Sequence, residues 1–193
     1  MKTKRRLSKK EIEKKYHESA SHPRRLIAYA IDWYLTSVLA MAPVIFFCSV
    51  ETGKEVLTVD ISLLSKNHAI IAFIVGLLLC LWYLVYLPNK NGQTFGKKIT
   101  SIKIEKMDNN PLDYLTLIKR ELVGVLLVEG VMFTCSTYFH ELIAMILGIS
   151  YSHYIAYAFT VVLVISIVLA IIKPEKRMIH DYIANTKVIL VKK

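Results

Sequence analysis

Two acidic side chains of this sequence stand inside long apolar runs, where a charge is costly. Asp32 and Glu129 each interrupt a segment that is otherwise almost free of charged residues. An ionisable group near the centre of a bilayer costs roughly 2.5–3.5 kcal/mol, so it usually has a partner or a function. Counted from Arg25 and Arg120, the two carboxylates lie at a similar depth. Two carboxylates at one depth could share a proton, because like charges repel strongly at low dielectric constant. A proton-coupled cation site needs this chemistry.

The same two carboxylates also fit roles without transport. Each could bond a basic or hydroxyl side chain and only hold helices together, or each could contribute to binding a partner. Arg25 stands two helical turns before Asp32, a separation of about 10 Å along a helix. We therefore expect no direct contact within this pair, and the three roles remain open at this point.

Motifs for enzymatic or metal chemistry are missing from the sequence. The segment 140–144 begins like the zinc motif HExxH, but Ala144 stands where the second histidine is required. There is no Gly-rich phosphate loop and no nucleophile motif such as GxSxG. Cys48, Cys80 and Cys135 contain no CxxC pair and fit buried apolar side chains. We expect a non-enzymatic protein without a cofactor or a bound metal.

Apolar runs long enough to cross a bilayer take up most of the chain. Of its 193 residues, 54% are hydrophobic, which is more than in ordinary soluble domains. A helix needs about 20 mainly apolar residues to cross the hydrocarbon core. We predict an all-α membrane protein built as a four-helix transmembrane bundle. The predicted spans are 26–50, 69–87, 122–138 and 154–172. The stretch 139–149 is also apolar and either extends the third span or re-enters the membrane from the outer surface.

The basic residues predict the orientation of this bundle. The segments 1–25, 88–120 and 173–193 hold 23 of the 25 Lys and Arg residues, and the loop 51–68 holds two. Basic residues collect on the cytoplasmic side of membrane proteins. We therefore expect a multi-pass protein of the cell membrane with both termini in the cytoplasm. The net charge of +10 has this explanation, and no nucleic-acid partner is expected, because base-stacking and groove-reading motifs are missing.

The polar segments add a tail and a small β element. Residues 1–22 form a basic cytoplasmic tail, which either binds anionic lipid or only fixes the topology, and Pro23 suits the start of the first span. Within the 88–120 loop, alternating isoleucines at 102 and 104 predict a short strand. The β-branched stretch 186–191 predicts a second strand in the C-terminal tail. We expect the two strands to pair on the cytoplasmic side and to rest on the bundle, because a lone two-stranded unit is marginal.

Three ordered segments together resemble the RDD family of bacterial membrane proteins. They begin at Arg25, Gly92 and His180, and the resemblance covers about residues 23–191. The family name refers to one arginine and two aspartates, which match Arg25, Asp32 and Asp181. Residues 23–193 are thus expected to form one RDD-like membrane domain. The other matching motif residues are Gly92, Gln93, Thr94, Gly96, Arg120 and Asn185. Asn185 replaces a usual glycine, but asparagine can adopt the same left-handed backbone. Tyr182 stands where the family often has a basic residue.

The resemblance implies several functions and does not select one. Some members are associated with sodium or potassium/proton antiport, and others with control of a membrane protease or with resistance to membrane-active peptides. The favoured hypothesis is cation/proton exchange through an inner-leaflet cluster, by a homo-oligomer because four spans are few for a carrier. The alternative is a regulatory or adaptor protein that binds a membrane protease, another partner or anionic lipid. A tight turn at Gly92 and Gly96 would bring Lys97 and Lys98 close to Asp181. The predicted site is therefore Arg25, Asp32, Lys97, Lys98, Glu129 and Asp181.

Overall fold

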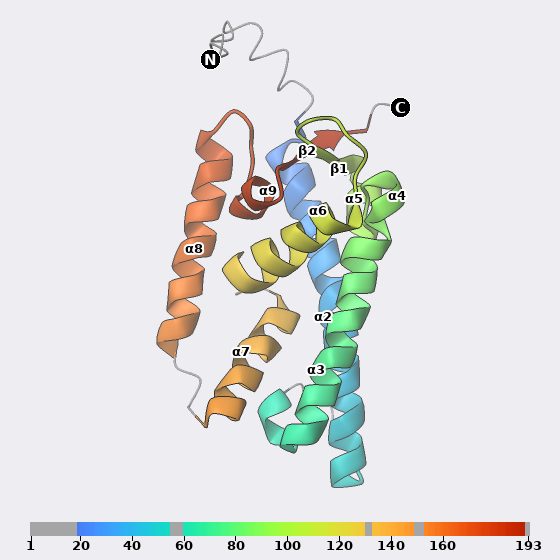
Figure 1. Cartoon of the computed structure of the whole chain (residues 1–193), viewed down its shortest axis with the longest axis vertical. Coiled ribbons are helices and arrows are strands. Elements are labelled where there is room, and N and C mark those ends of the chain that lie inside the picture. The colour runs from blue at the N-terminus through green and yellow to red at the C-terminus, as the bar shows by residue number, and fades with distance from the viewer. Residues whose placement is uncertain (1–18, 55–59, 130–132, 149–152, 192–193) are drawn as a thin grey trace, which may run out of the picture.

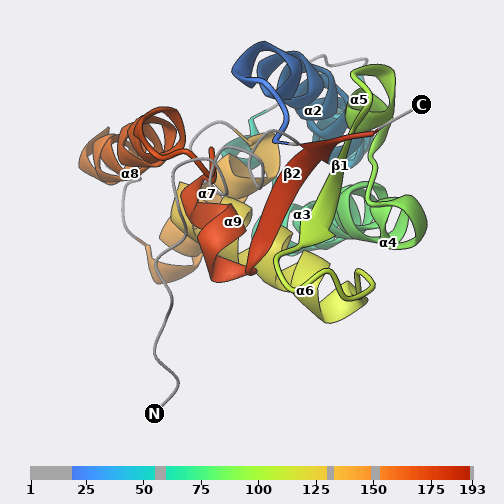
Figure 2. The same ribbon diagram turned by 90° about the horizontal axis from the view of Figure 1, so that it is seen from above.

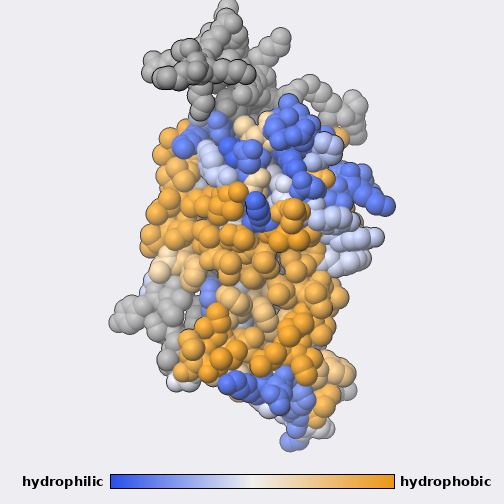
Figure 3. Space-filling view, in the orientation of Figure 1, coloured by the Kyte–Doolittle hydropathy of each residue, from blue (hydrophilic) through white to orange (hydrophobic). Residues whose placement is uncertain are grey.

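The computed structural model describes residues 19–54, 60–129, 133–148 and 153–191, with side chains from 157 onward in the last of these ranges. The predictions for the basic tail therefore fall almost entirely outside the described residues. Most of the described chain is helical, and its longest helices run roughly along the long axis of the molecule, whereas the segment labelled α6 crosses it (Figure 1). Apolar residues form a broad belt on the surface, with polar residues gathered above and below it (Figure 3). This distribution is typical of a protein that sits in a membrane.

Two long helices, α2 (His22–Thr52) and the continuous stretch Lys66–Asn91, pack side by side (Figure 1). α2 has Pro23 in its first turn, where the missing N–H costs nothing, as predicted. The second stretch consists of α3 (Lys66–Leu81), the π-helical η2 (Trp82–Tyr86) and α4 (Pro88–Asn91). The backbones approach closely, since a Cβ atom on Gly76 would lie 3.2 Å from the Ala40 carbonyl oxygen. A small residue at this crossing is what close helix packing in a membrane requires.

The predicted third span, 122–138, is not one helix. α6 (Tyr114–Ile118) continues into the π-helical η3 (Lys119–Glu129), and α7 (Thr134–Leu147) follows at an angle of 61°. The two parts have different neighbours: η3 packs against a short helix of the C-terminal tail, whereas α7 packs against α3 and α2. The bend makes this segment a broken span or a re-entrant pair. α7 also includes most of the apolar stretch 139–149, so that stretch belongs to the second part of the bent pair.

The number of spans depends on how this pair is counted. Two described helices, α2 and Lys66–Asn91, are long and apolar enough to cross a membrane, and the bent pair would be a third. The last long helix, α8 (His153–Ile172), stands beside the others and packs mainly on η3 (Figure 1). Its fully described part, Tyr157–Ile172, is apolar but shorter than the length expected of a span. The described chain thus has two or three candidate membrane-spanning helices, and the four-span arrangement stays a prediction.

The polar segments fold together at one end of the helices. β1 (Ile102–Lys106) and β2 (Thr186–Leu190) form an antiparallel ribbon in which Ile104 lies opposite Val188. Seen from above, the ribbon crosses the ends of the helices (Figure 2). Its buried face, with Ile102 and Val188, packs on Ala20 and Ala28, close to the start of α2. The ribbon, α5 (Phe95–Ile99) and α9 (Ile179–Ile183) are called the cap below.

Candidate functional site

Asp32 is the centre of a buried polar cluster between α2, η2 and α5. Its carboxylate accepts hydrogen bonds from the Tyr83 hydroxyl at 2.6 Å, the Thr94 hydroxyl at 2.5 Å and the Gly96 amide at 3.0 Å. The Lys97 ammonium group lies 3.0 Å from the second carboxylate oxygen. We call these five residues the Lys97 cluster. In this cluster the Lys97 ammonium group neutralises the Asp32 carboxylate, and the contacts together hold α5 against the two long helices.

Backbone geometry of the loop before α5 explains how this cluster forms. Gly92 has a φ of 67°, and a Cβ atom there would collide with the Ile104 carbonyl oxygen. Thr94 caps the start of α5 by accepting a hydrogen bond from the Lys97 amide. Gly96 lies directly on α2, where an added Cβ atom would be 2.8 Å from a carboxylate oxygen of Asp32. The two glycines therefore let the loop turn sharply and let its backbone reach the carboxylate.

Asp181 anchors a second cluster, in which two guanidinium groups meet one carboxylate. Arg120 Nε lies 3.2 Å from one carboxylate oxygen, and Arg25 Nη1 lies 3.8 Å from the other. Arg25 also donates a hydrogen bond of 2.9 Å to the Val188 carbonyl. Burial alone would raise the pKa of Asp181, but the basic groups around it, His180 first and then Arg120 and Arg25, lower it to about 2. Asp181 therefore stays ionised at physiological pH and joins α2, η3 and the cap.

Glu129 forms a different kind of pair with His180. One carboxylate oxygen lies 2.6 Å from His180 Nδ1, and the other accepts the His180 amide at 2.9 Å and the Ser166 hydroxyl at 2.6 Å. The three residues come from η3, α9 and α8. A Cβ atom on Gly124 would lie 2.5 Å from that of His180, so α9 rests directly on η3. We call Glu129, Ser166 and His180 the His180 cluster.

Arg120 also contacts the His180 ring. Its Nη2 lies 2.8 Å from His180 Nε2. The same Nε2 atom lies 3.6 Å from a carboxylate oxygen of Asp181. The ring therefore bridges Glu129 at Nδ1 and the Arg120–Asp181 pair at Nε2. The short contact between Nδ1 and Glu129 holds one hydrogen between the imidazole and the carboxylate.

These contacts separate residues that the sequence was expected to group. The described contacts include no hydrogen bond between Asp32 and Glu129, and the two carboxylates have no partner in common. The prediction that they share a proton is therefore wrong. Lys97 binds Asp32 instead of Asp181, because the close approach of Gly96 to α2 carries α5 to that helix. Lys98 is exposed and has no ion pair in the described part of the chain. The predicted single Arg/Asp/Asp/Lys cluster is in fact two clusters.

The remaining motif residues shape the cap. Gln93 donates a hydrogen bond of 2.8 Å to the Ile102 carbonyl. Asn185 has a φ of 52°, which confirms the predicted left-handed position after α9. Arg120 links the Asp181 cluster to the His180 cluster, since it contacts both Asp181 and His180, and it also bonds Glu121.

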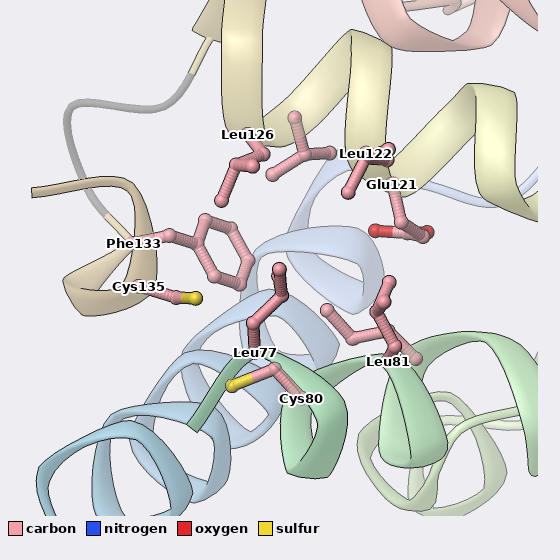
Figure 4. A pocket seen from close by; sticks show the side chains of 10 residues that line it. Leu77, Cys80, Leu81, Glu121, Leu122, Leu126, Phe133 and Cys135 are labelled. Carbon is pink, nitrogen blue, oxygen red and sulfur yellow. The ribbon is translucent and has the colours of Figure 1, made fainter. Parts of the chain in front are cut away.

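Four participating residues escaped the sequence-based site. They are Tyr83, Glu121, Ser166 and His180. Polar residues in or beside apolar runs were the available signal: Ser166 interrupts the apolar part of α8, and His180 directly precedes a motif aspartate. Glu121 also borders a small cavity of about 30 Å³ between α3, η3 and α7, which is otherwise lined by apolar side chains and two thiols (Figure 4). That cavity is separate from the His180 cluster.

Comparison with known proteins agrees with the motif residues. The model of the RDD family matches residues 19–185. The chain belongs to the RDD family. No curated protein and no solved structure matched it. The three residues that give the RDD family its name thus divide between two contacts here: Asp32 holds α5, and Arg25 and Asp181 hold the C-terminal part of the cap to α2. In this RDD protein the signature residues join the cap to the membrane helices.

Proposed function

We propose that this RDD protein is a non-enzymatic, multi-pass membrane protein that exchanges a cation for a proton at Glu129. The proposal includes four spans, with the cap and both termini in the cytoplasm, as the charge distribution favours. His180 is the proton-carrying partner of Glu129. A homo-oligomer is the expected working form, because four spans are few for a carrier.

The observation that carries this proposal is the chemistry of the partners of Glu129. The described part of the chain has four buried acidic residues, Asp32, Glu121, Glu129 and Asp181. Lys97 neutralises the first, and Arg120 contacts both Glu121 and Asp181. The described hydrogen bonds of Glu129 come from a hydroxyl, an amide and the imidazole of His180. Its charge can therefore change without breaking a bond to a permanent cation.

A proton and a cation would compete for this carboxylate. With His180 neutral, Glu129 is an anion in a span, and an added positive charge offsets the cost of burying it. That charge can be a proton on the dyad or a hard cation held by the oxygens of Glu129 and Ser166, the ligand type that such cations prefer. His180 lies on α9 of the cap, which supports access from the cytoplasmic side, and its ring also contacts Arg120 of η3. α8 packs mainly on η3, so a movement of α8 is the expected route to the other side.

Purified protein in proteoliposomes tests this proposal. A sodium or potassium gradient should drive a change of internal pH, and Glu129→Gln should slow it by at least about ten-fold, because the amide cannot release a proton. Glu51→Gln is the matched control, since Glu51 forms another Glu–His pair, with His68 at 2.5 Å, at the far end of α2. That variant should exchange at the rate of the unmodified protein. An inactive unmodified protein, or equal rates in Glu129→Gln and the unmodified protein, would overturn the proposal.

A regulatory or adaptor role is the second candidate. The cap exposes Phe95 and Ile99 on one side of α5, beside the unpaired Lys98. An exposed apolar patch with a basic rim suits a membrane-protein partner, such as a protease, or the lipid surface. This role would be favoured by two results together. A membrane protein should co-purify with the unmodified chain but not with a Phe95→Ser/Ile99→Ser variant, and neither protein should exchange cations for protons. Binding of the basic tail to anionic lipid remains part of the same candidate.

A further inference from the structure

Two buried donors at the cap end of α8 lack an acceptor. Arg177 is only 6% exposed, and its Nε has no hydrogen-bond partner among the described residues. The hydroxyl of Tyr182, five residues later in the chain, is also buried without a partner among the described residues. An unpaired buried donor is unfavourable, so each of these groups calls for an acceptor that the described residues do not supply.

Positive charge converges on the same place. The Arg177 guanidinium carbon lies 4.1 Å from the centre of the Tyr182 ring, and Lys173 Nζ lies 5.0 Å from it. Arg177 uses its other nitrogens on Glu175 at 3.3 Å and on the Asp181 carbonyl at 2.8 Å. Glu175 thus offsets part of one charge, and Lys173 adds another. A phosphate group, with several acceptor oxygens and a negative charge, matches these donors.

The surface next to these donors is apolar. Ile171 and Ile172, directly before Lys173, are 63% and 75% exposed, and Ile183, directly after Tyr182, is also exposed. A free phosphate ion would gain nothing from these side chains. A phospholipid would gain from both surfaces, because its acyl chains can lie along α8 while its phosphate meets the donors.

We propose that Lys173, Arg177 and Tyr182 bind the phosphate of an anionic phospholipid at the end of α8. The lipid supplies the missing acceptor for Arg177 Nε and the Tyr182 hydroxyl. Its chains extend along the apolar face of α8, the helix that carries Ser166 of the His180 cluster. This site is distinct from the basic N-terminal tail and does not depend on the exchange activity.

Retention of lipid by the purified full chain tests the site. The protein is incubated with vesicles of phosphatidylcholine with or without phosphatidylglycerol, extracted in mild detergent and analysed for bound lipid by mass spectrometry. Lys173→Gln should weaken phosphatidylglycerol binding about five-fold, the usual effect of one basic residue. Tyr182→Phe should weaken it about two- to five-fold, because only the hydroxyl bond is lost. Thermal unfolding should confirm that both variants remain folded.

Two variants control for general charge and ring effects. Lys90→Gln removes an exposed lysine of α4, and Tyr114→Phe removes a hydroxyl from an exposed tyrosine at the start of α6. Neither should change lipid retention by as much as two-fold. Equal loss in Lys90→Gln and Lys173→Gln would overturn the proposal, as would equal retention of phosphatidylcholine. Displacement of the lipid by inorganic phosphate alone would show a free-anion site and would also overturn it.

Discussion

The Lys97 cluster and the His180 cluster hold the same kind of group in opposite ways. Both bury a carboxylate on a membrane helix and both tie it to the cap. Asp32 faces the ammonium group of Lys97, whereas Glu129 faces an imidazole, an amide and a hydroxyl. The first carboxylate is paired with a lysine, and the second has no lysine or arginine among its described partners. The difference separates a carboxylate that a basic side chain neutralises from one that a histidine and a serine hold.

Removing the charge of Asp32 should give the largest loss of stability. Asp32→Asn leaves the Lys97 ammonium group buried without a counter-ion, which costs about 3–5 kcal/mol. The midpoint of thermal unfolding in detergent should fall accordingly, and the double variant Asp32→Asn/Lys97→Met should recover part of the loss. Glu129→Gln, which strands no permanent charge, should cost clearly less. Equal losses at Asp32 and Glu129 would erase the distinction between the clusters.

The ionisation of Asp181 should make the stability of the protein depend on pH. Its pKa of about 2 lies below that of an unfolded aspartate, about 3.9. A lowered folded-state pKa stabilises the protein above the unfolded pKa, and this contribution is lost as pH falls through the folded pKa. The loss should begin near pH 4 and reach about 2–3 kcal/mol near pH 2. Unfolding midpoints measured across this range should show the decline, and Asp181→Asn should show a shallower one. A decline of equal depth in both proteins would assign it to other groups.

Alanine substitutions at the glycines that make close backbone contacts should give the next largest loss of stability and should distinguish the two clusters. Gly96→Ala places a methyl group against the backbone of α2 and the Asp32 carboxylate, whereas Gly124→Ala meets the short helix α9. Overpacking costs about 1–3 kcal/mol, with the higher value expected at Gly96 because a long packed helix cannot shift. Gly53 has open space around it but a φ of 64°, so Gly53→Ala shows the cost of left-handed backbone strain without overpacking. A larger loss at Gly124 would mean that the His180 cluster is the more rigid of the two.

The smallest effect should come from Lys98, the neighbour of Lys97 on α5. Lys98→Met should change the stability by less than about 0.5 kcal/mol, since the side chain is exposed. Lys97→Met leaves Asp32 uncompensated and should cost several times more. Chemical denaturation of both variants in the same detergent gives the comparison. A similar loss in the two would place Lys98 in the cluster as well.

Sequence patterns predicted the elements better than the contacts between them. Composition and apolar length indicate membrane helices, and alternating isoleucines mark β1, because these signals are local. The pairing of Lys97 with Asp32 depends on a close approach of Gly96 to α2, which no local pattern contains. The bend after η3 depends on two different sets of neighbours, so the apolar run alone suggested one span. His180 was seen only as a helix-start neighbour of Asp181, because its partner Glu129 is far away in sequence.

The late position of the cap residues has a consequence for how the protein is made. Asp181 and His180, the partners of Arg25, Arg120 and Glu129, are translated after all of the apolar segments. A nascent chain therefore enters the bilayer before Arg25 and Glu129 have these partners, while Arg120 has only Glu121, and it stays incomplete until α9 and β2 leave the ribosome. Final closure is then a post-insertional step, and a chain interrupted before it would expose these incompletely paired charges to the proteases that remove faulty membrane proteins.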